Sequence, residues 1–395
     1  MRWLVPVAAI AACAGPSPPK AVAPERERST SAPAAAAEPD TQSPQAAPTE
    51  AGPLADECPA PDAALGRVAR SLAEGYSESK PTLDASEVEQ RLREEGGPYV
   101  WPHAWTLAGR GDVRQVVAPR LRAWLDSWSE AGERRCGLAV VEHGGGRWVV
   151  AAVAADALAD LEPVPAQVRI GSWVEVHAEM RVPFSGAKVV VLGPRGAPKA
   201  VPTAANGPSV RARFAADAAG PWLVQVLADV EHGPRPVLEA VLIAGEGARR
   251  GRIQHEAPGE NTPAQMLEPE ALLYQMLQAA RQSEGLPAIT REKRLDQLAQ
   301  EQALALSRAR RVAHDLGDGD PEARVAASGL SLAAVGENVA HAESVARAHR
   351  ALWSSPSHRS NILSPYFDAI GIGIAQDSSG EVWVCELFGR FGARP

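Results

Sequence analysis

Aromatic residues are scarce in this chain of 395 residues, where they make up 5% of the sequence, although ten of them are tryptophan. Cysteine occurs four times, which is too few for a miniature domain held together by disulfides. No apolar run reaches the length of about 18 residues that a transmembrane helix needs. Long basic runs are also missing and the formal net charge is −8, so nucleic acid is not an expected partner.

The rest of the amino-acid composition indicates folded domains. Hydrophobic residues make up 45% of the chain, which is enough to build buried cores. A length of 395 residues leaves room for two or three domains of about 100–200 residues each. Helical and strand periodicities both occur along the chain, which predicts the α+β fold class.

Residues 1–13, MRWLVPVAAIAAC, have the positive start, short apolar stretch and small residues of an export signal. Cys13 directly follows Ile-Ala-Ala and resembles the cysteine of a bacterial lipobox, which is exposed by cleavage and then lipidated. We therefore expect Cys13 to anchor a lipoprotein in a membrane at the cell envelope. The alternative is an ordinary signal peptide and a periplasmic or secreted protein.

Residues 14–56 are expected to form a disordered tether. The segment from Ala14 to Ala55 contains nine prolines and no aromatic residue. Such a composition cannot bury enough apolar surface to offset the entropy of ordering the chain, and proline favours extended conformers. The tether would hold the folded domains away from the membrane.

Residues 57–162 are predicted to form a small α+β domain. Apolar residues recur at helical spacing before residue 75 and again over 113–129, and Gly144–Gly146 separates two short strand patterns. Cys58 and Cys136 could pair in an oxidising compartment. No catalytic cluster stands out in this part of the sequence.

Residues 163–248 contain short strand patterns punctuated by glycine and proline. This arrangement is typical of a β-sandwich of the immunoglobulin-like type. We expect the sandwich to act as a spacer or an adhesion module, because no pattern in it indicates a site.

Residues 262–395 have the clearest helical signals. Apolar stripes over 272–280 and 295–306 each predict a helix. Apolar residues alternate on both sides of Asp377-Ser-Ser-Gly380, which predicts a β-hairpin.

Five motifs follow one another in this last part, and in this order they are specific although each alone is weak. They are His314 after a helix, Gly336-Glu337-Asn338, Trp353-Ser-Ser-Pro-Ser-His358-Arg-Ser-Asn361-Ile362, Ile370-Gly-Ile-Gly373 and Trp383-Val-Cys-Glu-Leu-Phe388-Gly. Over about residues 265–392 the chain resembles the bacterial type of the CAP superfamily, also called the SCP domain. The resemblance implies an α-β-α sandwich, with a small antiparallel sheet between helices.

The resemblance also implies a cleft lined by two histidines and two acidic residues. His314 and His358 match the histidines, and Glu337 matches the first acid. The second acid has no match, because Ser-Ser-Pro at 354–356 occupies its stretch. The complete set of four cleft residues is therefore not expected here.

Two neutral imidazoles can bind a divalent metal such as zinc, so His314 and His358 are possible metal ligands. Glu337 could complete that set or polarise a water. Without metal, Glu337 could instead orient an imidazole through a hydrogen bond. The structural alternative is that His358 ties a helix to a loop and Glu337 caps backbone amides.

The leading functional hypothesis is an exported, lipid-anchored cell-envelope protein whose CAP domain binds a ligand or partner, which could be a lipid, a glycan or a protein. One alternative is a metal-assisted hydrolase that uses the His/Glu cleft. No residue is a clear nucleophile, since sequence neighbours such as Ser357 and His358 rarely face one another. A second alternative is a structural envelope protein with a vestigial cleft.

Two stretches of the chain share a pattern. Residues 113–153 and 343–388 both run from a helix with tryptophan through a loop to a glycine-containing strand, a turn and a second strand with tryptophan. The upstream stretch could be a decayed copy of the CAP domain without its histidines and acid. Coincidental α+β patterning is the alternative.

Overall fold

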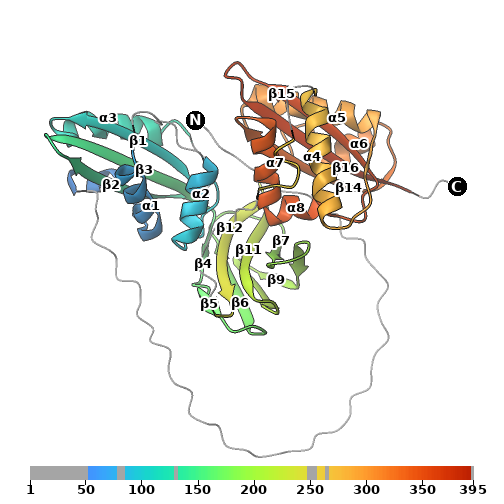
Figure 1. Cartoon of the computed structure of the whole chain (residues 1–395), viewed down its shortest axis with the longest axis horizontal. Helices are drawn as coiled ribbons and strands as arrows, with labels where there is room; N and C mark the ends of the chain where they lie inside the picture. The colour runs from blue at the N-terminus through green and yellow to red at the C-terminus, as the bar shows by residue number, and fades with distance from the viewer. Residues whose placement is uncertain (1–51, 78–84, 129–131, 247–255, 263–266, 393–395) are drawn as a thin grey trace, which may run out of the picture.

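The computed structural model describes residues 52–77, 85–128, 132–246, 256–262 and 267–392. They form three folded units that follow one another along the chain (Figure 1). Helices and several separate sheets are present, which confirms the predicted α+β class. The predicted export signal, Cys13 and nearly all of the predicted tether lie outside the described residues. No helix in the described part of the chain has the length and apolar character needed to span a membrane.

The first unit packs short helices on a three-stranded antiparallel sheet with the strand order β1-β3-β2. Its elements are η1 (Gly52–Glu57), α1 (Ala63–Glu74), α2 (Ala85–Glu94), β1 (His103–Arg110), α3 (Val113–Leu125), β2 (Glu133–His143) and β3 (Arg147–Ala157). The 3-10 helix η1 buries Leu54 in the core, so the folded chain begins at Gly52 and not at residue 57. Strand β1 was not predicted, because most of its residues are half-buried and give no alternating pattern.

Cys58 and Cys136 form a disulfide, with their Cα atoms 5.8 Å apart and a sequence separation of 78. Beside it, Pro61 forms a parallel bridge with Cys136, and the Asp62 amide donates to the Cys136 carbonyl at 2.8 Å. Asp62 also caps α1 by accepting from the Leu65 amide at 3.0 Å. The crosslink therefore holds the start of α1 against β2.

The second unit is a β-sandwich made of a four-stranded sheet, β4-β6-β10-β9, and a five-stranded sheet, β5-β12-β11-β7-β8. Its strands are β4 (Ala159–Leu161), β5 (Gln167–Val168), β6 (Trp173–Met180), β7 (Ala187–Leu192), β8 (Lys199–Val201), β9 (Thr203–Asn206), β10 (Ser209–Ala215), β11 (Gly220–Val230) and β12 (Gly233–Ala244). Along β6 and β10 every second residue is buried, so each strand turns one face to the core. Because β4 pairs with β6, the sandwich begins at Ala159 and not at residue 163.

The third unit is an α-β-α sandwich around a sheet with the strand order β13-β15-β16-β14. Its elements are α4 (Pro269–Ser283), β13 (Thr290–Arg291), α5 (Lys293–Ala309), α6 (Pro321–Ala327), β14 (Leu332–Ala342), α7 (Val345–Ser354), α8 (Pro356–Ile362), β15 (Ala369–Gln376) and β16 (Val382–Phe391). Two hydrophobic cores fill it, one between the sheet and α4 with α7, the other between the sheet and α5 with α6.

Two glycines let α5 lie directly on β15. A Cβ atom at Gly371 would lie 2.0 Å from the backbone of Leu295, and one at Gly373 would lie 2.2 Å from the backbone of Ala299. No side chain fits at such distances. The glycines of the Ile-Gly-Ile-Gly motif are therefore required for the close approach of α5 to β15.

The first unit repeats the topology of this third unit. In each, a strand is followed by helix and then by a hairpin, and the first strand pairs antiparallel with the last: β1 with β3, and β14 with β16. In each, a short parallel pairing precedes the main helix, through Pro61 and Cys136 in the first unit and through β13 and β15 in the third. A Cβ atom at Gly137 would lie 2.1 Å from the backbone of Leu65, just as one at Gly371 would lie against the backbone of Leu295. Helix and strand thus approach one another equally closely in both units.

The strand registers show which residue of the first unit replaces Glu337. Glu337 pairs with Leu387, which also pairs with Gly371. In the first unit the matching partner is Val153, which pairs with Gly137 on one side and with Ala104 on the other. Ala104 therefore stands where the third unit has its acid, which supports the interpretation of the first unit as a copy without the site.

Candidate functional site

The centre of the candidate site is Glu337, which lies in the middle of β14 and has no exposed surface. Its Oε1 accepts from His314 Nδ1 at 2.8 Å, and its Oε2 accepts from the Arg324 guanidinium. Arg324 also donates to the His314 carbonyl at 2.5 Å. One carboxylate thus holds a histidine and an arginine in a closed, buried cluster.

The local sequence explains how these side chains meet. Helix α5 ends at Ala309, where Arg310 adopts a left-handed φ of 50°, and the chain then turns towards His314. Asp320 caps α6 and Pro321 opens it, so Arg324 lies one turn into the helix and faces β14. The sequence analysis missed Arg324, although a buried ionised acid requires a cationic partner.

The charges of this cluster support one another. Burial alone would raise the pKa of Glu337, but the Arg324 charge and the His314 hydrogen bond outweigh it and leave that pKa lowered. Burial would lower the pKa of Arg324, and the Glu337 charge raises it instead. Glu337 is therefore an ionised acceptor, and His314 donates from Nδ1, which leaves Nε2 as its other hydrogen-bonding atom.

His358 lies on α8, is fully buried and stands close enough to His314 for their charges to interact. Burial first, and the proximity of His314 second, lower the pKa of His358 well below its ordinary value, so the imidazole is neutral. Within the described residues neither ring nitrogen of His358, nor Nε2 of His314, has a hydrogen-bond partner. The structure thus brings the three residues predicted from the sequence into one buried region.

A second polar group, which the sequence analysis did not identify as a site, continues from this cluster. Asn338 donates to Glu386 Oε2 at 2.9 Å and to the His358 carbonyl at 3.2 Å. Asn361 donates to Asn338 Oδ1 at 3.0 Å. Burial raises the pKa of Glu386 to about 7, against the lowering effect of the Asn338 hydrogen bond. Glu386 therefore adds a buried acid from β16. Its position in the sequence motif does not indicate that it lies near the histidines, and only the fold brings it there.

The residues present do not fit a zinc ion held by His314, Glu337 and His358. Both oxygens of Glu337 are engaged, Oε2 also receiving the Cys385 thiol at 3.5 Å. Burial raises the pKa of Cys385 well above its ordinary value, so it supplies no thiolate. Two imidazoles remain, whereas protein zinc sites use three or four ligands. Glu337 serves to orient His314.

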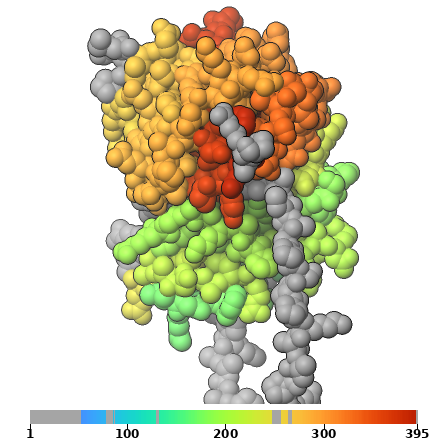
Figure 2. Space-filling model, turned by 90° about the vertical axis from the view of Figure 1, so that its right-hand side faces the viewer, coloured from blue at the N-terminus to red at the C-terminus, as the bar shows by residue number. Residues whose placement is uncertain are grey.

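The β-sandwich covers this region. In the space-filling view the third unit rests on the sandwich (Figure 2). The tight turn between β11 and β12 has positive φ angles at His232 (73°) and Gly233 (104°). A Cβ atom at Gly233 would lie 3.2 Å from the Cβ of His314, so this glycine lets the turn approach the histidine. His314 is 1% exposed as a result.

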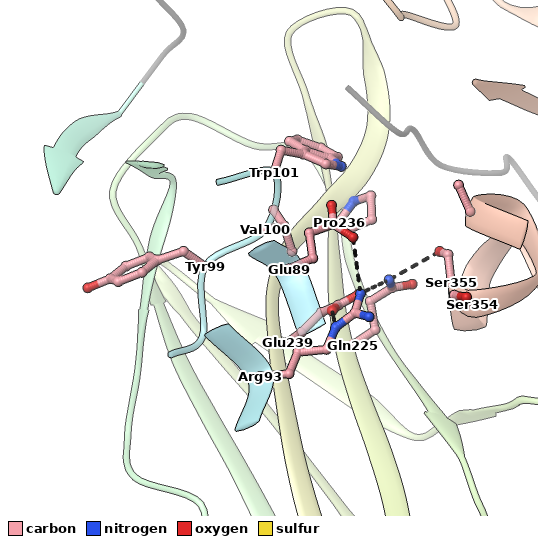
Figure 3. A pocket seen from close by; sticks show the side chains of 11 residues that line it. Glu89, Arg93, Tyr99, Val100, Trp101, Gln225, Pro236, Glu239, Ser354 and Ser355 are labelled. Carbon is pink, nitrogen blue, oxygen red and sulfur yellow. Dashed lines mark hydrogen bonds and ion pairs between the residues drawn. The ribbon is translucent and has the colours of Figure 1, made fainter. Parts of the chain in front are cut away.

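A hydrogen-bonded chain joins all three units beside the site (Figure 3). Arg93 of α2 donates to Glu239 of β12 at 2.6 Å, and Gln225 of β11 donates to the same carboxylate at 2.7 Å. Gln225 Oε1 then accepts from the Ser357 amide at 3.0 Å, while its Nε2 donates to Ser355 Oγ at 3.3 Å. Since Ser357 precedes His358 on α8, the sandwich holds the helix that carries this histidine.

The buried Glu386 should give the stability of the protein an unusual dependence on pH. The pKa of Glu386 is raised in the folded state, so the folded state binds this proton more tightly than the unfolded state does. The stability that protonated Glu386 gives to the fold is therefore complete below about pH 4.5 and is lost as pH rises through 7. Glu386→Gln removes this loss and keeps an acceptor for Asn338. The variant should be about 2–3 kcal/mol more stable than wild type at pH 8 and nearly equal at pH 4.5, as measured by urea unfolding.

The exposed Glu301 on α5 offers a control, since Glu301→Gln should change stability little at either pH. A constant difference between Glu386→Gln and wild type from pH 4.5 to pH 8 would contradict the buried, proton-binding role.

Comparison with known proteins gives one family match. The model of the cysteine-rich secretory protein family, CAP, matches residues 274–387. No curated protein sequence gives a significant match.

Among solved structures, an outer surface protein from Borrelia burgdorferi is 23% identical, with 31% of this chain and 93% of that chain covered and a TM-score of 0.30. An extracellular protein with an SCP domain from Bacillus anthracis is 15% identical, covering 58% and 88%, with a TM-score of 0.29. A cysteine-rich secretory protein from Staphylococcus aureus is 10% identical, covering 58% and 86%, with a TM-score of 0.28.

Proposed function

Because residues 274–387 form a CAP domain, we propose that this chain is an exported, lipid-anchored cell-envelope protein whose CAP domain is a binding module. Its binding site is the buried region around His314, Glu337 and His358, beneath the β11–β12 turn. The ligand is a small polar molecule or a polar group of a larger one.

One observation carries this proposal. Three imidazole nitrogens, Nε2 of His314 and both of His358, are buried and have no hydrogen-bond partner among the described residues. Asn361 Oδ1 and Glu386 Oε1, in the adjoining group, are in the same condition. A buried polar atom without a partner costs about 1–3 kcal/mol, so a ligand that pairs several of these atoms would gain affinity from them.

The arrangement favours binding over hydrolysis. Within the described residues neither Ser355 nor Ser357 forms a hydrogen bond with the imidazole of His314 or His358. The two serine hydroxyls bond to one another instead, at 3.1 Å. Nucleophilic catalysis needs a hydroxyl or thiol within hydrogen-bond reach of its base. His314 Nε2 therefore has no hydroxyl or thiol partner among the described residues, and we infer that it acts as a hydrogen-bonding group.

Native mass spectrometry of the full chain, purified from the envelope of its host, tests the proposal. Wild type should carry a bound molecule, and His358→Gln should lose most of it with little change in melting temperature. His143→Gln, which alters an imidazole on β2 of the first unit, should retain it. Wild-type protein without any bound molecule would count against a binding role.

The anchor is tested separately. Cys13 should make the chain fractionate with membranes, because several acyl chains on one lipidated cysteine hold a protein stably on a bilayer. Cys13→Ser should move it to the soluble fraction. Wild type that is soluble, or a variant that stays membrane-bound, would argue against lipidation at Cys13.

A further inference from the structure

The outer face of the four-stranded sheet of the sandwich carries a groove that is separate from the CAP site. The groove encloses about 990 Å³, and β6 and β10 form its floor. Across that floor Glu175 pairs with Arg213, and His177 pairs with Arg211. Pockets of about 300–1,000 Å³ are the size that holds small ligands or a short stretch of a polymer.

Trp173 is the outstanding feature of this groove. Its residue surface is 61% exposed, although Val174 and Val176 on the same strand are 1% and 2% exposed. The guanidinium of Arg213 lies 4.3 Å from the centre of the Trp173 ring and steadies it through a cation–π contact. A large aromatic ring on a rigid strand, in a chain with 5% aromatic residues, is thus presented to solvent.

The charges of the groove select among possible ligands. Glu175 accepts hydrogen bonds and Arg211 donates them, so the floor has both signs. Both ring nitrogens of His177 are already paired, Nδ1 with Glu162 at 2.5 Å and Nε2 with Ser209 at 3.0 Å. A lipid surface or an amphipathic helix needs a continuous apolar strip, which one tryptophan does not provide. Single-stranded nucleic acid needs a positively charged groove.

We propose that this groove binds a neutral glycan chain. The C–H face of one sugar ring packs on the Trp173 ring, where an apolar surface is buried without loss of hydrogen bonds. The sugar hydroxyls, which both donate and accept, pair with the mixed side chains of the floor. The sandwich is then the adhesive part of the protein, and this inference does not depend on the ligand of the CAP site.

The test measures binding of the full chain to an array of neutral oligosaccharides that includes β-1,4-linked chains of glucose and of N-acetylglucosamine, followed by calorimetry with the best binder. Trp173→Ala should weaken binding at least tenfold and leave the melting temperature unchanged, since the side chain is largely exposed. Tyr366→Ala, a matched loss of an aromatic residue that is 68% exposed on the CAP domain, should bind as wild type.

Three results would overturn the proposal: no oligosaccharide is bound, Trp173→Ala binds as tightly as wild type, or a peptide copy of residues 14–51 binds the groove in place of sugar. The last result would assign the groove to the proline-rich segment, because aromatic grooves also bind polyproline helices. His358→Gln should leave glycan binding intact, which separates this site from the CAP site.

Discussion

Glu337→Gln is expected to destabilise the CAP domain by about 3–5 kcal/mol, the range measured when one partner of a buried ion pair is removed. Glu337 is fully buried, and its carboxylate is the acceptor for both His314 and Arg324. Glutamine nearly preserves the shape but carries no charge, so the Arg324 guanidinium stays buried without compensation. Urea unfolding at pH 7 measures the loss.

A double-mutant cycle with Arg324→Met provides the control. Removing both partners should cost clearly less than the sum of the two single changes, because no uncompensated charge remains. Strict additivity of the two changes would contradict a direct charge interaction between Arg324 and Glu337.

The pH dependence of this cluster has the opposite sign to that of Glu386. The folded pKa of Glu337 is lowered, so its contribution is present above its unfolded pKa of about 4.5 and is lost as pH falls further. The destabilisation caused by Glu337→Gln should therefore shrink in acid.

Opening the Cys58–Cys136 disulfide should cost the first unit about 4 kcal/mol. The bond closes a loop with a sequence separation of 78, and loop-entropy estimates give about 3 kcal/mol for 15 residues and 4.7 kcal/mol for 100. The loss should appear as an earlier unfolding transition of the first unit when the protein is heated with a reductant in a calorimeter.

The double variant Cys58→Ser/Cys136→Ser should unfold at the lower temperature with or without reductant. Cys385 is a buried free thiol, so Cys385→Ala should respond to reductant as wild type does. A wild-type protein insensitive to reductant would contradict the prediction. Disulfides persist in oxidising compartments, so this bond supports the proposed export.

The sequence by itself determined the local features of this protein. Apolar residues at helical spacing placed α4 and α5, and alternation around Asp377–Gly380 placed the β15–β16 hairpin. Ordered motifs selected His314, Glu337 and His358. These signals are readable because each depends on neighbours along the chain or on a pattern of residues in a fixed order.

Only the tertiary structure decided how those residues are partnered. Arg324 reaches Glu337 from a separate helix, Glu386 meets Asn338 across two strands, and Gly233 of the sandwich covers His314. The likeness of the first unit to the CAP domain likewise became visible in strand register, where Ala104 takes the place of the acid. Burial, charge compensation and register arise between segments that are distant in sequence, and no local periodicity encodes which segment will supply the partner.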